Sequence, residues 1–148
     1  APWLAARGAS LGGTFLLVAA RASPRLFRSL VLLCPADGPS LLAGLGGIEQ
    51  LERAGDPDRE YYGRFDAAAL RPCLRRLDLV AVARDMPRVL LAHARDDETV
   101  PFSHSARLAA VLAAPTHFIA LDEGGHHGPG RSPEVARATL DWVVSNGP

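Results

Sequence analysis

The sequence predicts an α/β fold of three layers, in which a mostly parallel sheet of about four strands lies between helices. Four short apolar runs recur along the chain, at 2–6, 29–34, 88–94 and 117–122. The last three are nearly continuous rather than alternating, which is typical of strands buried on both faces. Helical patterns lie between and after these runs, and strands that alternate with helices form parallel sheets.

Three helices are predicted around this sheet. Residues 11–22 are apolar almost all round, which indicates a buried helix, and Pro24 ends it because proline disfavours helix in the preceding residue. Residues 103–114 place three aliphatic side chains on one helical face. Residues 133–145 form an amphipathic pattern after Ser132, which we expect to be the N-cap of that helix.

The span 36–87 breaks the alternation, since it is rich in glycine, proline and charge with some helix expected near 67–84. We interpret it as an insertion between the second and third strands of a single domain. Within it, Tyr61, Tyr62 and Phe65 are candidates to line a substrate pocket, although a packed lid explains them equally well.

Composition excludes several classes of function. The 16 basic and 16 acidic residues cancel, so no basic surface is expected for nucleic acid or an anionic membrane. Every lysine or arginine position is arginine, so mechanisms that need a catalytic lysine are excluded. No apolar run is long enough to span a membrane. Cys34 and Cys73 lack metal-ligand spacing, so no metal or other cofactor is expected, and Cys34 should pack as a small buried apolar residue.

The stretch Gly8-Ala9-Ser10-Leu11-Gly12 fits the pattern G-x-S-x-G between a predicted strand and a predicted helix. In that setting Ser10 occupies a tight turn that exposes its hydroxyl as a nucleophile, and Gly8 and Gly12 avoid steric clashes. The backbone N–H of Leu11 can then donate to an oxyanion. The simpler alternative is a glycine-rich turn whose serine only caps the helix.

A serine nucleophile needs a base and a third group that orients the base. Acidic residues follow the third strand in "RDDETVP" (95–101), and two histidines follow the fourth in "EGGHHG" (123–128). Asp96, Asp97 or Glu98 can supply the acid, and His126 or His127 the base. The two histidines, with the acidic residues just before them, could instead bind a metal, but no third ligand has a recognised spacing.

The order Ser, Asp, His and these loops resemble the C-terminal half of an α/β-hydrolase. "HARDDETVP" is similar to the superfamily pattern H-G-x-x-D-x-x-V-P, with Ala94 in place of glycine, and this match puts the acid at Asp97. "EGGHHG" resembles the G-x-G-H loop after the last strand and puts the base at His126. "GASLGG" and the residues after it are similar to the prolyl-oligopeptidase-like and related esterase branches. The insertion at 36–87 matches no known pattern.

The resemblance implies a serine hydrolase that cleaves a small-molecule carboxylic ester or a peptide bond through an acyl-enzyme. It also implies that the chain is a fragment, because the second oxyanion donor follows an earlier strand with no counterpart here. The first strand would then be an open edge, which needs the missing N-terminal half or self-association. The alternative function is a catalytically inactive scaffold of the same fold, with an incomplete oxyanion hole.

Three further residues have structural interpretations. His93 is expected to be buried at a strand end and bonded to the backbone rather than to act in catalysis. Trp3 and Trp142 are expected in the core.

Overall fold

The structure is a computed structural model that describes residues 3–57 and 66–147. The chain divides into two compact units, of which the first comprises the chain up to Ala36 and from Leu79 onward. The second unit is Asp37–Asp78, so residues 79–87 of the predicted insertion belong to the first unit. No helix in the described part of the chain is both long and apolar enough to cross a membrane.

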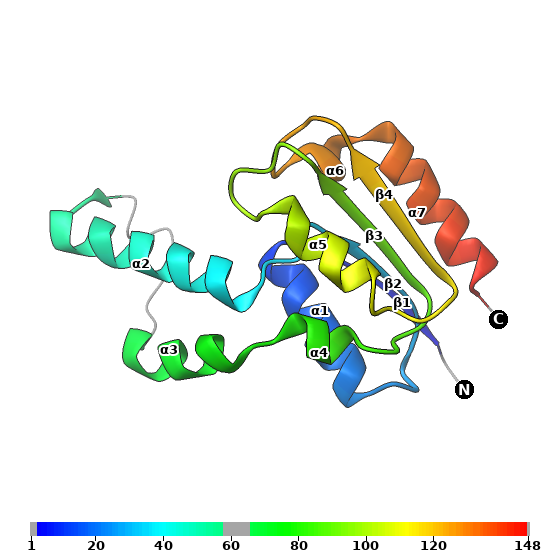
Figure 1. Ribbon diagram of the computed structural model, residues 1–148, viewed down its shortest axis with the longest axis horizontal. Helices are drawn as coiled ribbons and strands as arrows, with labels where there is room; N and C mark the ends of the chain where they lie inside the picture. The colour runs from blue at the N-terminus through cyan, green and yellow to red at the C-terminus, as the bar shows by residue number, and fades with distance from the viewer. Residues whose placement is uncertain (1–2, 58–65, 148) are drawn as a thin grey trace. The chain divides into compact units, whose positions relative to one another are not determined.

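The first unit is built on a sheet of four parallel strands in the order β1-β2-β3-β4 (Figure 1). The strands are β1 (Leu4–Ala9), β2 (Phe27–Leu33), β3 (Val89–Ala94) and β4 (Thr116–Leu121). Because all four run in the same direction, their carboxyl ends meet at one edge of the sheet. The predicted α/β architecture is therefore confirmed.

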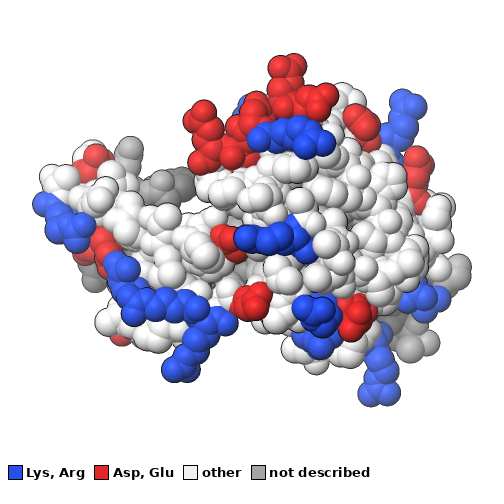
Figure 2. All heavy atoms as spheres, in the orientation of Figure 1, with Lys and Arg blue, Asp and Glu red and all other residues white. Residues whose placement is uncertain are grey.

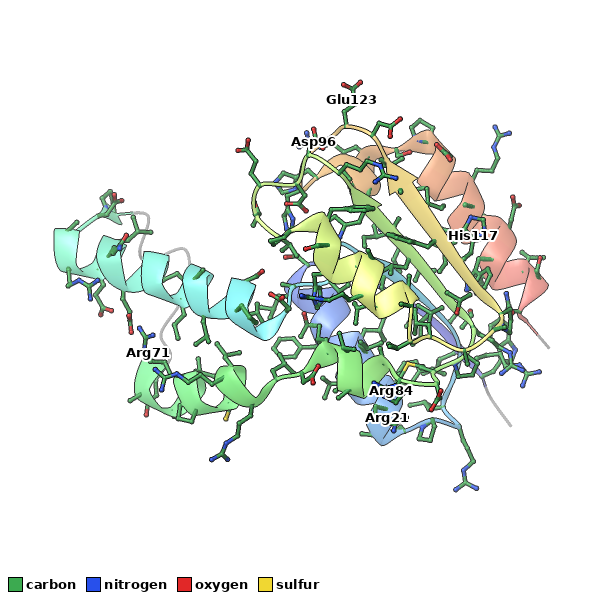
Figure 3. The ribbon with its side chains drawn as sticks, viewed as in Figure 1. Arg21, Arg71, Arg84, Asp96, His117 and Glu123 are labelled. Atoms are coloured by element: carbon green, nitrogen blue, oxygen red, sulfur yellow. The ribbon has the colours of Figure 1, made fainter. Side chains whose placement is uncertain are left out.

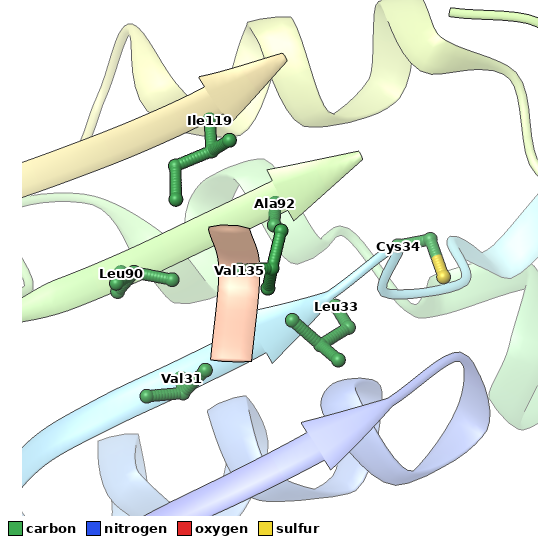
Figure 4. Packing of buried hydrophobic residues seen from close by; sticks show 7 residues of the cluster. All are labelled: Val31, Leu33, Cys34, Leu90, Ala92, Ile119 and Val135. Atoms are coloured by element: carbon green, nitrogen blue, oxygen red, sulfur yellow. The ribbon is translucent and has the colours of Figure 1, made fainter. Parts of the chain in front are cut away.

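Helices cover both faces of this sheet (Figures 1 and 4). They are α1 (Leu11–Ala22), α4 (Leu79–Ala83), α5 (Phe102–Ala109), α6 (Gly128–Arg131) and α7 (Pro133–Ser145). On the α7 face, Val135 packs against a buried apolar cluster from β2, β3 and β4 that includes Val31, Leu90 and Ile119. Ser132 caps α7 as predicted, since its hydroxyl accepts a hydrogen bond from the N–H of Val135 at 3.2 Å.

The second unit contains two helices, α2 (Gly38–Ala54) and α3 (Ala67–Arg76). The side chain of Asp37 caps α2 by accepting from the N–H of Ser40 at 2.8 Å. Arg71 of α3 forms an ion pair with Glu49 of α2 (Figure 3). Tyr61, Tyr62 and Phe65 lie outside the described residues, so their suggested pocket stays a prediction.

Four sequence predictions about the fold need correction. The helix at 11–22 was expected to be buried, but its outer face is open, with Phe15 63% exposed and Val18 39% exposed. The helix expected at 103–114 begins one residue earlier and ends at Ala109, although its apolar face includes the buried Leu108. The long helix α2 was not predicted, because its glycines and proline suggested irregular structure. Trp3 was expected in the core, but it is 39% exposed beside the edge strand β1, where there is no neighbouring strand in the described sheet to cover it.

Candidate active site

Ser10 occupies the turn that joins β1 to α1. Its backbone has φ 49° and ψ −124°, a left-handed region that costs free energy for any residue with a side chain. Its N–H donates to the carbonyl of Leu33 at 2.9 Å, which ties the turn to the end of β2. The Ser10 side chain makes no capping hydrogen bond to α1, so the simple capping alternative is wrong.

The glycines of this turn have different roles. A Cβ atom at Gly8 would lie only 2.5 Å from the carbonyl oxygen of Gly12, so the strand and the helix approach too closely for a side chain there. A Cβ atom at Gly12 would meet nothing within 4 Å, which contradicts the expected steric reason for this glycine. The second close approach is at Gly13, where a Cβ atom would lie 3.1 Å from Pro35 Cβ.

Residues from three loops meet at the carboxyl edge of the sheet. His126, in the turn after β4, has its Nε2 3.0 Å from Ser10 Oγ. Its Nδ1 lies 2.8 Å from Oδ2 of Asp97, which follows β3. A neutral imidazole with its proton on Nδ1 satisfies both contacts, donating to Asp97 and accepting from the Ser10 hydroxyl. The residues lie 116 and 29 positions apart in the chain, so only the parallel sheet brings them together.

Asp97 is held in its ionised form. Its Oδ1 accepts hydrogen bonds from the N–H groups of Thr99 at 2.8 Å and Val100 at 2.9 Å. Burial raises the pKa of the Asp97 carboxyl, but the hydrogen bonds from Val100, His126 and Thr99 outweigh it and bring the pKa below its ordinary value. The carboxylate is thus a fixed negative charge that can orient the imidazole of His126.

His93 supports Asp97 from the other side. Its Nε2 lies 3.0 Å from Asp97 Oδ2 and 2.9 Å from the Val100 carbonyl, so Nε2 carries the proton. Ser105 Oγ lies 2.6 Å from Nδ1 and donates to it. Burial lowers the pKa of His93, and its hydrogen bonds offset this only in part, so the ring is uncharged at neutral pH. The sequence analysis expects His93 to be buried and bonded to the backbone, but it does not predict the contact of His93 with Asp97.

The alternative candidates lie elsewhere. Asp96 accepts the backbone N–H groups of Gly124 at 3.0 Å and Gly125 at 2.8 Å, so it links the loop after β3 to the loop before His126. These two hydrogen bonds lower the pKa of the Asp96 carboxyl. His127 is exposed, and its ring makes an edge-to-face contact with the ring of His126. Glu98 is also exposed. Neither forms a hydrogen bond with Ser10.

Acidic side chains gather at this edge of the sheet (Figure 2). Asp96 and Glu123 extend from the neighbouring loops after β3 and β4 (Figure 3), and the exposed Glu98 and Asp122 follow the same strands. Arg95 pairs with Asp122 at 3.4 Å. A separate hollow of about 290 Å³, near Arg28 and Arg88, lies at the opposite end of the strands and contains none of these residues.

The α1 helix begins at Leu11, directly after Ser10. The first N–H groups of a helix have no partners within it, and its dipole favours negative charge at this end. Leu11 is therefore placed to offer its N–H beside Ser10. Among the described residues, the group suited to a metal ion is Cys34, Asp97 and His126, rather than the two adjacent histidines considered from the sequence.

Comparison with solved structures identifies the fold as that of the α/β-hydrolases. Mouse alpha/beta hydrolase domain-containing protein 10 has a TM-score of 0.65 at 21% identity, over 95% of this chain and 61% of its own. The metagenomic enzyme MGS-MChE2, from lagoon sediments of Mar Chica in Morocco, has a TM-score of 0.69 at 16% identity, over 96% of this chain and 61% of its own. Est1E from Butyrivibrio proteoclasticus has a TM-score of 0.64 at 18% identity, over 95% and 60%.

The profile of the prolyl oligopeptidase family matches residues 3–146, almost the whole sequence. The chain therefore belongs to the prolyl oligopeptidase family. It spans about three fifths of the length of the solved structures named above. A search of curated proteins found no matching relative.

Proposed function

We propose that this chain carries the nucleophile, base and acid of a serine hydrolase that cleaves a carboxylic ester or a peptide bond. The observation that carries the proposal is the continuous hydrogen-bond line from Ser10 Oγ through both nitrogens of His126 to Asp97. The family to which the chain belongs is one of hydrolases, and Est1E has the same fold. Fold alone does not select between ester and peptide substrates.

The mechanism has two halves. Ser10 Oγ attacks the substrate carbonyl carbon while His126 Nε2 takes the hydroxyl proton, and Asp97 stabilises the resulting imidazolium. The tetrahedral intermediate collapses as His126 returns that proton to the leaving alcohol or amine, which gives an acyl-enzyme on Ser10. Water, deprotonated by His126, then attacks the acyl carbon, and protonation of Ser10 Oγ by His126 releases the carboxylic acid and restores the enzyme.

The negative oxygen of each tetrahedral intermediate needs hydrogen-bond donors. The N–H of Leu11 is the donor that we assign in this chain, and the second donor is expected from a loop outside it. Removing one such donor typically lowers kcat by about 10²–10³. The chain alone is therefore expected to be a slow hydrolase, with most of its activity dependent on additional polypeptide.

The test compares the chain with its Ser10→Ala variant on a p-nitrophenyl acyl ester and on a chromogenic peptide. We expect a burst of about one equivalent of nitrophenol from the parent and none from the variant, because only Ser10 forms the acyl-enzyme. Ser40→Ala is a matched control, since Ser40 lies in α2 and should leave the burst unchanged. The absence of a burst from the correctly folded parent would instead favour the inactive scaffold, and a burst from Ser10→Ala equal to that of the parent would contradict Ser10 as the nucleophile.

We also propose that the free edge of β1 pairs with further polypeptide, either an N-terminal segment of the hydrolase or a second copy of the chain. β1 is an outer strand of the described sheet, and Leu4 in it is 45% exposed. Nearby in the chain, Leu11 and Phe15 of α1 are 44% and 63% exposed. Light scattering should detect concentration-dependent association, whereas a stable monomer with cooperative unfolding would contradict this proposal.

A further inference from the structure

Cys34 lies inside the candidate active site, although the proposed reaction does not use it. It follows β2, and its side chain is almost fully buried, with 2% of the residue exposed. Its Sγ lies 3.2 Å from the carbonyl oxygen of His126, to which the thiol donates. Ligand atoms of Cys34, Asp97 and His126 all lie within 4.8 Å of one another. The three residues therefore bring sulfur, oxygen and nitrogen ligands into one cluster.

The backbone holds Cys34 in this position at an energetic cost. Its φ is 37°, in the left-handed region that side chains rarely adopt. Its N–H donates to the carbonyl of Ala92 at 2.9 Å, which fixes the turn against the end of β3. Strain of this kind persists only where the surrounding structure enforces it, and it is concentrated at functional sites.

The protonated thiol is a poor nucleophile but a good ligand once a metal displaces its proton. Burial raises the pKa of the Cys34 thiol to about 11. A hydrogen bond from the backbone of Ser10 lowers this pKa, and the negative charge of Asp97 raises it further. A thiol with this pKa is protonated and resists oxidation at neutral pH. A divalent ion changes the balance, because one thiolate and one carboxylate neutralise its two charges beside the buried Cys34 and Asp97.

We propose that Cys34, Asp97 and His126 form an inhibitory binding site for a borderline-soft divalent cation such as Zn²⁺. Zinc takes cysteine sulfur, histidine nitrogen and carboxylate oxygen as ligands. The acidic rim formed by Asp96, Glu98, Asp122 and Glu123 raises the local concentration of cations, because Arg95 offsets only part of its charge.

The site requires shifts of up to ~1.2 Å between its ligand atoms. Tetrahedral zinc bonded to Nδ1 of His126 and Oδ2 of Asp97 needs these atoms to be ~3.3 Å apart. They are now 2.8 Å apart. The Cys34 sulfur needs to lie ~3.6 Å from each of these two atoms, and the three ligand atoms now lie within 4.8 Å of one another. The sulfur completes three protein ligands and leaves a fourth position for water or substrate.

Metal binding at this point removes the base, an effect that rests on the proposed function. In the resting state Nδ1 of His126 carries the proton and Nε2 accepts from Ser10. The metal binds the Nδ1 lone pair, so the imidazole proton moves to Nε2, and the Cys34 thiol proton is released to solvent. Nε2–H then points at Ser10 Oγ and cannot accept its proton, which leaves the nucleophile unactivated.

The binding test has two measurements. Absorption in the near ultraviolet detects Co²⁺ bound to a thiolate, and calorimetric titration measures the affinity of the chain for Zn²⁺. We expect a thiolate–Co²⁺ band at one equivalent, and Zn²⁺ binding at least tenfold weaker in Cys34→Ser. Cys73→Ser is the matched control, because Cys73 is exposed in α3, and it should bind like the parent. If the band is absent from the parent, or lost in Cys73→Ser instead of Cys34→Ser, the site is refuted.

Circular dichroism checks that Cys34→Ser folds, and Cys34→Ala provides a second variant if it does not. The inhibition is measured separately, as the rate at which a fluorophosphonate labels Ser10 with and without Zn²⁺. We expect Zn²⁺ to slow labelling at least tenfold in the parent and much less in Cys34→Ser. A parent that shows the cobalt band but is never labelled would refute the hydrolase and leave the metal site intact. A parent that is labelled equally fast with and without bound Zn²⁺ would refute the inhibition.

Discussion

Adding one methyl group at Gly8 should disrupt the turn that presents Ser10. The new Cβ would lie 2.5 Å from the carbonyl oxygen of Gly12, 2.6 Å from its carbonyl carbon and 2.8 Å from the nitrogen of Gly13. All three atoms belong to the backbone of the first turn of α1, so no side chain can rotate away to relieve the contact. The helix must move away from β1, and Ser10 must move with it.

The size of the effect follows from two opposing contributions. Overpacking of a well-packed interior typically costs about 1–3 kcal/mol of unfolding free energy. Replacing glycine by alanine also restricts the unfolded chain, which returns about 0.4–1 kcal/mol. The midpoints of these two ranges differ by about 1.3 kcal/mol, so we expect Gly8→Ala to lower the free energy of unfolding by roughly 1 kcal/mol.

Gly12→Ala is the matched control, four residues along the same turn. Its Cβ would meet nothing within 4 Å, and alanine favours helix over glycine by up to about 1 kcal/mol. Urea unfolding followed by circular dichroism should show Gly8→Ala below the parent, and Gly12→Ala equal to it or above. If Gly8→Ala were as stable as the parent, the close approach of β1 and α1 at Ser10 would be wrong.

Further predictions concern the base, the acid and the sheet edge. His126→Ala should slow fluorophosphonate labelling by about 10²–10⁴, the usual contribution of a general base, whereas His127→Ala should stay within threefold of the parent because it has no bond to Ser10. Asp97→Asn should slow labelling by at least about 10², since the amide cannot stabilise the imidazolium; Asp96→Asn should slow it less, because Asp96 only holds the loop before His126. Equal effects within either pair would contradict the assignments. Replacing the exposed Phe15 by glutamate should reduce self-association in light scattering if that face is covered by another copy.

The inner strands were predictable because a strand buried on both faces consists of a nearly continuous run of apolar residues. Each residue of β3 is buried, and its run of aliphatic side chains predicts a central strand without further information. The edge strand β1 is half-exposed, and this is why Trp3 beside it was wrongly expected in the core. The helix α2 was missed because its glycines disfavour helix, whereas its favourable signals are confined to its start, where the side chain of Asp37 caps it and a proline occupies the first turn.

The candidate site was predictable to a similar extent. The order of Ser10, Asp97 and His126 in the chain, each after a predicted strand, suffices to place them at one edge of a parallel sheet. The contact of Cys34 with the loop of His126 spans 92 residues and has no recognised spacing, so no local pattern reveals it. The sequence also could not show that a side chain would fit at Gly12, because the space there depends on the direction of the α1 helix and not on the motif.

The most direct test of the account is to incubate the chain with a fluorophosphonate and locate the label by peptide mass spectrometry. A serine reacts with this probe only when its hydroxyl is activated by a neighbouring base. The account predicts one label per chain, on Ser10, which is absent after His126→Ala and retained after His127→Ala. A label on another serine, or an unlabelled Ser10 in a correctly folded chain, would contradict the claim that Ser10, His126 and Asp97 form a working nucleophilic site.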